Sequence, residues 1–255
     1  MRDIQLAGAW LARHGLGDTQ PTPALATRLT VRRRADVADS VMLAALIIAV
    51  ALVQVSRMGD DHPGPRSWVA VAALVGAVLL LRFLLDRWVR AVDRRAAAGL
   101  VRRATHPVPP GWRTVVGVPQ LTFVVASTGG ALALAASALT VDDAEVRYGA
   151  VVLLIGLTGV AAGIAVRIGH LLTRPVVADG EDTLTADLVM RIEDGRQATT
   201  PTFQWTLPVV LFGTAPGWWG ALFVALVVGG LVAFVAIQRR TPHAAAAARH
   251  AMAAR

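Results

Sequence analysis

The sequence predicts an all-α fold, a polytopic transmembrane helix bundle in which six spans form three antiparallel hairpins. Three observations predict it. Six stretches are apolar enough to lie in lipid, where a spanning helix needs about 20 residues. The arginines between these stretches fall almost entirely on one side of the predicted membrane, and basic residues stay on the cytoplasmic side. Tryptophan and tyrosine rings lie near the span ends, at the level of the lipid headgroups.

The composition fits a membrane protein better than a soluble domain. Of the 255 residues, 55% are hydrophobic and the mean hydropathy is +0.55, whereas a soluble domain has roughly 45–50% apolar residues even when glycine is counted. The net charge of +8 is spread over several connectors. We therefore expect anionic lipid headgroups, and no nucleic acid, as the counter-charge. The absence of cysteine excludes disulfides, thiolate metal sites and cysteine nucleophiles.

The first four predicted spans are 40–56, 68–85, 114–140 and 148–172. The first is interrupted only by Gln54, and the second begins at Trp68 and carries Arg82 near its inner end, where a long side chain can snorkel. A short loop rich in turn residues joins this pair, which predicts an antiparallel hairpin. A short acidic loop joins the third and fourth spans, which predicts a second hairpin.

The last apolar block, 201–238, is too long for one span. Pro208, Pro216 and Gly217 divide it into predicted spans at 201–215 and 217–238. A helix over residues 203–214 would be about 18 Å long, well short of a hydrocarbon core of about 30 Å. We therefore expect the fifth segment to extend through Pro201, to thin the bilayer or to be re-entrant.

The arginine placement predicts that both termini are cytoplasmic. A basic N-terminal segment (1–39), the connectors 86–113 and 173–200, and a basic tail (239–255) together hold 20 of the 25 arginines, and the outer loops hold three. An even number of crossings follows, because five spans would place the basic tail outside. No apolar signal-peptide core precedes Val41, so we expect the first helix to be retained. The predicted location is the bacterial cytoplasmic (inner) membrane, as a multi-pass protein.

Polar residues inside the spans are few, and no carboxylate lies near the middle of a span. The third span is the candidate pathway, because Pro119 would free a backbone carbonyl while Gln120, Ser127 and Thr128 would line a hydrated seam. Pro208 is a further candidate, because short segments interrupted by proline often border binding sites. In the alternative interpretation, serine and threonine bond within their own helix and proline only kinks it.

Basic residues near the inner face are candidate lipid or partner contacts. The stretch 86–104 continues the second helix as a basic amphipathic helix, which lies on anionic lipid or docks an acidic partner. Arg167 and His170 lie one turn apart near the inner end of the fourth span. The stretch 176–194 is acidic, so we expect it to pair with the basic one and to end at Gly195. The candidate contacts of the basic helix are Arg87, Arg90, Arg94, Arg95, Arg102 and Arg103.

Small residues recur four positions apart at Gly159 and Gly163 and at Ala225 and Gly229. Such faces let helices approach closely in lipid. They are candidates for packing within the bundle or for an interface between copies in a homo-oligomer.

No metalloprotease, nucleophile-elbow or P-loop motif is present, and no cofactor or metal site is predicted. The sequence therefore favours a non-enzymatic anchoring, sensing or assembly component that binds a membrane or cytosolic partner protein at the cytoplasmic face. The alternative is a small transporter or permease-like subunit with a polar pathway near the third and fifth helices.

Overall fold

A computed structural model describes residues 2–58, 65–98, 111–174, 181–212 and 218–253. These residues form helices and connecting turns, and they contain no strand, so the all-α prediction is confirmed for the part described. The helices are α1 (Arg2–Arg13), α2 (Pro23–Met58), α3 (Pro65–Ala98), α4 (Trp112–Val115), α5 (Val118–Ala138), α6 (Ala144–Thr173), α7 (Glu181–Ala198), α8 (Thr202–Phe212), α9 (Trp218–Arg240) and α10 (Ala244–Ala253).

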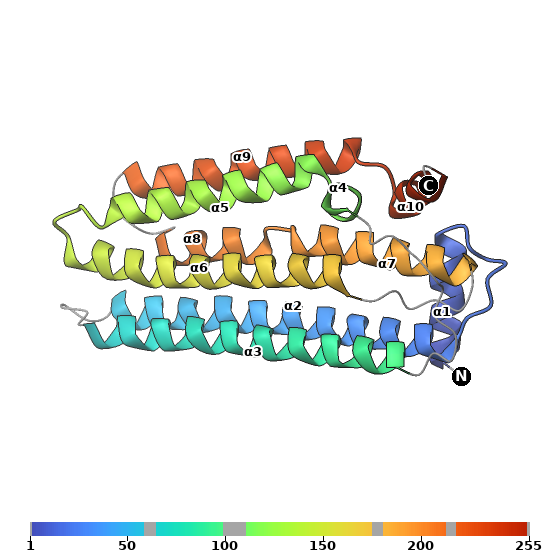
Figure 1. Cartoon of the computed structure of the whole chain (residues 1–255). Coiled ribbons are helices and arrows are strands. Elements are labelled where there is room, and N and C mark those ends of the chain that lie inside the picture. Colours follow the sequence, from blue (N-terminus) through green and yellow to red (C-terminus); the bar gives the residue numbers. More distant parts are fainter. Residues whose placement is uncertain (1, 59–64, 99–110, 175–180, 213–217, 254–255) are drawn as a thin grey trace.

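The long helices lie side by side along one axis (Figure 1). Close contacts join α2 to α3, α3 to α6, α6 to α5 and α8, and α9 to both α5 and α8. The two ends of the chain lie at the same end of this bundle, together with α1, α7 and α10. We refer to it as the terminal end.

Five helices are long and apolar enough to cross a membrane. These candidate spans are Pro23–Ser56, Ser67–Ala96, Val118–Ala138, Ala144–Thr173 and Trp218–Arg240. Their outer faces carry large apolar side chains, such as Leu52, Val69 and Val232, which are each about two-thirds exposed. A water-soluble bundle would hide such side chains, whereas lipid covers them. The chain is an integral membrane protein.

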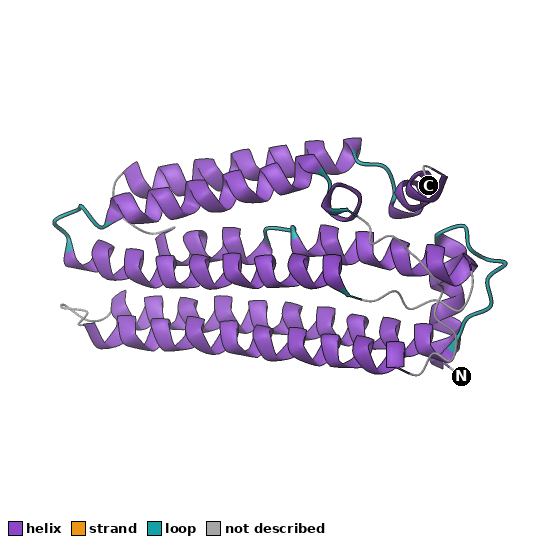
Figure 2. Cartoon of the chain, in the orientation of Figure 1, coloured by secondary structure: helices purple, strands orange, loops and turns teal. Residues whose placement is uncertain are grey.

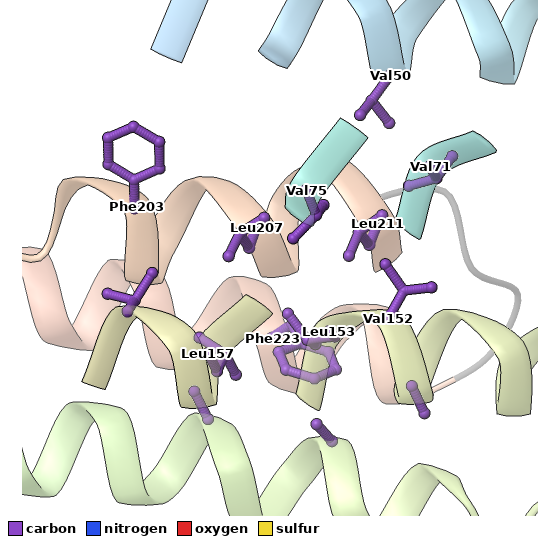
Figure 3. Packing of buried hydrophobic residues seen from close by; sticks show 14 of the residues in the cluster. Val50, Val71, Val75, Val152, Leu153, Leu157, Phe203, Leu207, Leu211 and Phe223 are labelled. Atoms are coloured by element: carbon purple, nitrogen blue, oxygen red, sulfur yellow. The ribbon is translucent and has the colours of Figure 1, made fainter. Parts of the chain in front are cut away.

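An apolar core fills the centre of the bundle (Figure 3). Leu153 and Leu157 of α6 are fully buried and face Val75 of α3, Leu207 of α8 and Phe223 of α9. Because α8 contributes to this core, it is packed inside the bundle even though it is too short to span a membrane alone.

A second apolar cluster lies at the terminal end, where α1 and α10 pack against α7. Ala7, Val189 and Ala248 are its most buried members. Polar contacts reinforce it, because Trp10 Nε1 donates to Glu193 at 3.1 Å and His14 Nε2 lies 2.8 Å from the same carboxylate. The predicted N-terminal segment and tail are therefore helical and folded against the acidic connector.

Several element boundaries differ from those predicted. The helix of the first span begins at Pro23 and has 36 residues, about 54 Å, so it extends well beyond a bilayer core. The third begins only at Val118, after Gly117 takes a positive φ of 85°. Pro119 lies in the first turn of α5, where proline needs no hydrogen-bond partner, so it starts the helix and does not kink it.

The fifth predicted span is the shortest observed, at 11 residues and about 16 Å. It follows α7 end to end, separated by a break at residues 199–201 that is visible as a loop in Figure 2. Pro201 explains the break, because it has no N–H to continue α7 and it disfavours helical geometry at Thr200. The six predicted spans therefore correspond to five long helices and one short segment that follows a break.

Candidate functional site

Charged side chains converge in the interior at the terminal end. Asp93 of α3 binds three arginines: Arg28 Nε at 3.0 Å, Arg32 Nη2 at 2.9 Å and Arg174 Nη1 at 3.0 Å. Arg28 and Arg32 lie one turn apart on α2, and Arg174 follows the last residue of α6. Three segments therefore meet on one carboxylate.

Two aspartates of α7 complete this network. Asp187 binds Arg28 at 2.8 Å and Arg191 at 2.9 Å, while Asp194 binds Arg32 at 2.9 Å and Arg174 at 3.4 Å. We call the whole set the buried ion-pair cluster, and it comprises Arg28, Arg32, Asp93, Arg174, Asp187, Arg191 and Asp194. It joins α2, α3, α6 and α7.

The sequence predicted a different pairing. Among the described residues, the acids of α7 bind arginines of α2 and the end of α6, and none of the basic helical face of α3. The only α3 side chain in the cluster is Asp93, an acid within the basic stretch. Gly195 also does not end its helix, since α7 continues to Ala198.

The electrostatics of the cluster are governed by burial. Burial by itself would raise the pKa of Asp187, but Arg28, Arg174 and Arg191 outweigh it and hold that pKa below its usual value. Burial also opposes ionisation of Asp194, yet Arg32 keeps the pKa of this carboxyl low. The pKa of the Arg174 guanidinium is lowered, chiefly by burial. Both aspartates are charged at neutral pH.

These lowered pKa values predict acid sensitivity. A carboxyl whose pKa is lower in the folded chain adds stability above its unfolded pKa of about 3.9, and this stability is lost as the pH falls through the folded value. We expect the unfolding midpoint in detergent to stay constant from about pH 7 to pH 5 and to fall below about pH 4. Tryptophan fluorescence during heating measures it. If the unfolding midpoint has already fallen near pH 6, the aspartates of the cluster are not the cause of the acid sensitivity.

A cavity of about 260 Å³ lies beside the cluster, between α2, α3, α6 and the break that separates α7 from α8. A smaller cavity of about 90 Å³ lies next to it, and the two share Arg82, Asp86 and Arg167 in their walls. The smaller one is also lined by Gly159 and Gln204. We call the two cavities together the charged crevice.

Polar groups of the crevice have unused hydrogen-bonding capacity. Within the described part of the chain, Arg174 Nε has no acceptor and its Nη2 has only a 3.5 Å ion-pair contact with Asp187. His170 Nε2 and Gln204 Oε1 are buried without a hydrogen-bond partner there. Because buried polar atoms are nearly always satisfied, these three side chains are suited to bind a polar ligand.

The crevice also holds charges outside any ion pair. Arg90 and Arg167 line its wall, and neither forms an ion pair with a described carboxylate. Asp86 is likewise unpaired among the described residues, whereas Arg82 binds Asp39 at 2.8 Å. Arg90 and Arg167, together with Arg174, are suited to bind a carboxylate or phosphate, although five aspartates also line the larger cavity.

The break between α7 and α8 positions backbone groups at this site. Thr200 and Thr202 line the cavity, and α8 begins where Trp205 N donates to Pro201 O at 3.1 Å. The first N–H groups of a helix have no partner within it, and they carry partial positive charge. The N-terminus of α8 therefore adds to the attraction for an anionic group.

The candidate pathway residues of α5 do not line this crevice together. Gln120 Nε2 donates to Thr241 Oγ1 at 2.8 Å, and Ser127 Oγ to the Val124 carbonyl at 3.3 Å. Thr128 Oγ1 accepts from Gln204 Nε2 at 2.7 Å, which brings one of these residues next to the crevice. Pro119 is in the first turn of α5 and Pro208 lies inside α8.

The predicted contact arginines fall into two groups. Arg87, Arg94 and Arg95 are exposed on the extension of α3. Arg90, Arg167 and His170 instead line the crevice. Arg102 and Arg103 lie outside the described residues.

The predicted packing residues also differ from one another. A Cβ on Gly159 would lie 2.5 Å from Leu79 Cδ1, so α6 and α3 pack closely there. A Cβ on Gly163 or Gly229 would meet nothing within 4 Å. Ala225 and Gly229 lie on the exposed face of α9.

Among the described residues, no group of three histidine, aspartate or glutamate side chains is placed to hold a metal ion. Comparison with protein-family models, curated proteins and solved structures finds no match for this chain. Function is therefore inferred from the crevice itself.

Proposed function

We propose that this protein is a non-enzymatic, multi-pass protein of the bacterial cytoplasmic membrane that binds a small polar solute carrying an acidic group, as a permease-like subunit. The observation that carries the proposal is the charged crevice, where Arg174 Nε, His170 Nε2 and Gln204 Oε1 are buried without a hydrogen-bond partner among the described residues. A helix break borders this crevice, as at the substrate sites of many transporters.

The proposed topology has six crossings and cytoplasmic termini. Five crossings are the long apolar helices, and the sixth is α8 together with the break and the end of α7. This arrangement puts the arginine-rich segments on the cytoplasmic side of the membrane. The crevice would then face the cytoplasm, while the apolar core closes the bundle on its other side.

Cysteine substitution tests both the crevice and the topology, because the chain has no native cysteine. Gly163→Cys places a thiol in the crevice wall, and Val166→Cys, three residues along α6, faces outward and is 52% exposed. In inside-out vesicles we expect Gly163→Cys to react with a membrane-impermeant thiosulfonate and Val166→Cys to stay protected in lipid. In intact cells neither should react.

The charge of the reagent tests the class of solute. We expect an anionic thiosulfonate to modify Gly163→Cys faster than a cationic one, because the smaller cavity that Gly163 lines has two arginines, Arg82 and Arg167, and one aspartate, Asp86, in its wall. Adding Arg167→Gln should reduce this preference. Reaction from the cell exterior would contradict the topology, and an equal or reversed preference would contradict an anionic solute.

A second function, binding of a partner protein at the cytoplasmic face, is favoured by a different observation. Arg87, Arg94 and Arg95 are exposed on the extension of α3, where they are free to meet an acidic surface. Replacing the three with glutamine should abolish crosslinking to a stoichiometric partner in native membranes. If crosslinking recovers only the lone chain, or a homo-oligomer that survives the substitution, this second function is excluded.

A further inference from the structure

A separate cavity of about 740 Å³ lies at the terminal end, on the opposite side of α7 from the buried ion-pair cluster. Its walls come from α4 and the start of α5, the end of α9, and α10. Because α5 and α9 are both candidate spans and the cavity lies at their ends, we place it at the level where these helices would leave the bilayer. Trp112, which directly precedes the lining residue Arg113 and is 38% exposed, is the residue type that prefers this interfacial layer.

The charged side chains that line this cavity are arginines. Arg113, Arg196 and Arg240 line it together with His250, and no carboxylate of the described residues does. Arg196 Nη2 donates to the Pro242 carbonyl at 2.7 Å, which leaves its other guanidinium nitrogens available. Neither Arg113 nor Arg240 forms an ion pair with any described carboxylate. The cavity therefore has unneutralised positive charge at its rim.

Most of the remaining wall is apolar, and the polar residues Thr114, Gln120 and Thr241 complete it. Val118 of α5 and Ala236 and Ile237 of α9 form the apolar part on the side of the membrane spans. Ala247 and Ala251 of α10 close the side away from the bundle. A soluble anion would gain nothing from these aliphatic side chains, whereas an acyl chain beginning below a charged headgroup would contact them along its length.

We propose that this cavity is a binding site for an anionic glycerophospholipid. Arg113, Arg240 and Arg196 bind the phosphate through charge-assisted hydrogen bonds, and the acyl chains lie against Ala236 and Ile237 as they enter the bilayer. The occupied cavity would fasten α10 to the ends of α5 and α9. This inference rests on the cavity and its charges, and it does not depend on solute binding in the charged crevice.

The test compares lipids on the purified full chain in a neutral detergent, with binding followed by native mass spectrometry and by thermal stabilisation. The probes are phosphatidylglycerol, phosphatidylcholine and inorganic phosphate. We expect saturable binding of phosphatidylglycerol and little binding of phosphatidylcholine. In Arg113→Gln/Arg240→Gln the affinity for phosphatidylglycerol should fall about thirtyfold, since each arginine at a membrane surface contributes about fivefold.

The matched control is Arg33→Gln/Arg34→Gln, which removes the same charge from exposed positions of α2 and should bind like the wild type. Ala236→Trp keeps every charge but fills the apolar wall, and it should also weaken binding. Circular dichroism verifies that each variant is folded. Equal affinity for the two lipids, an equal loss in the control, or displacement of the lipid by inorganic phosphate would overturn the proposal.

Discussion

Asp187→Asn is expected to lower the free energy of unfolding by about 3–5 kcal/mol, the usual cost of removing one partner from a buried ion pair. The Asp187 carboxylate binds Arg28 at 2.8 Å and Arg191 at 2.9 Å, and its side chain is only 2% exposed. Asparagine has nearly the same shape but no charge, so the remaining two aspartates would face four arginines. Unfolding by sodium dodecyl sulfate in mixed micelles, followed by tryptophan fluorescence, measures the change.

Asp142→Asn is the matched control for this change. Asp142 is exposed in the turn between α5 and α6, so we expect its replacement to shift stability by no more than about 0.5 kcal/mol. The pH dependence gives a second readout. Asp187→Asn has no carboxyl to protonate at this position, so its stability should fall less than that of the wild type below about pH 4. Equal unfolding curves for the two variants would show that the cluster contributes little.

The membrane-crossing helices could be predicted from the sequence because lipid leaves the backbone few alternatives. In lipid, an apolar run such as residues 217–238 is stable only as a helix. The observed α9 (Trp218–Arg240) matches this run closely. The predicted continuation of the second helix is also observed, through to Ala98. Charge alternation with an apolar stripe was sufficient to indicate it.

The buried ion-pair cluster could not be predicted, because its partners are far apart in the sequence. Arg28 lies 159 residues from Asp187, and Arg32 lies 162 from Asp194. With 25 arginines and 17 acidic residues, many pairings satisfy the same charge balance. One local signal was present: Arg28 and Arg32 are spaced to share a helix face. That face became visible only when the N-terminal segment proved to be helical.

The crevice was missed for a related reason. The sequence indicates polar residues of a single span, those of α5, whereas the crevice is lined by residues of five helices near the bundle end. Arg167 and His170 were identified as unusual and were interpreted as headgroup contacts. Their position in the crevice wall depends on how α7 folds back over α6, which no local pattern specifies.

Gly195→Ala is expected to destabilise the protein by about 2 kcal/mol, although alanine is the better helix former. A Cβ at this position would lie 2.7 Å from the Val115 carbonyl oxygen and 3.0 Å from Val115 Cγ1. Because the closest atom belongs to the backbone, no rotamer change relieves the clash, and overpacking of this kind costs about 3 kcal/mol. The gain in helix propensity, about 1 kcal/mol, offsets only part of this overpacking cost.

Gly8→Ala separates the two effects. Gly8 lies in the middle of α1, and a Cβ there would meet nothing within 4 Å, so only the propensity gain of about 1 kcal/mol should remain. The two alanine variants should therefore change stability in opposite directions in the same detergent titration. If both stabilise the protein, α4 does not press against α7 at Val115. In that case this contact does not fix the wall that α4 supplies to the cavity of about 740 Å³.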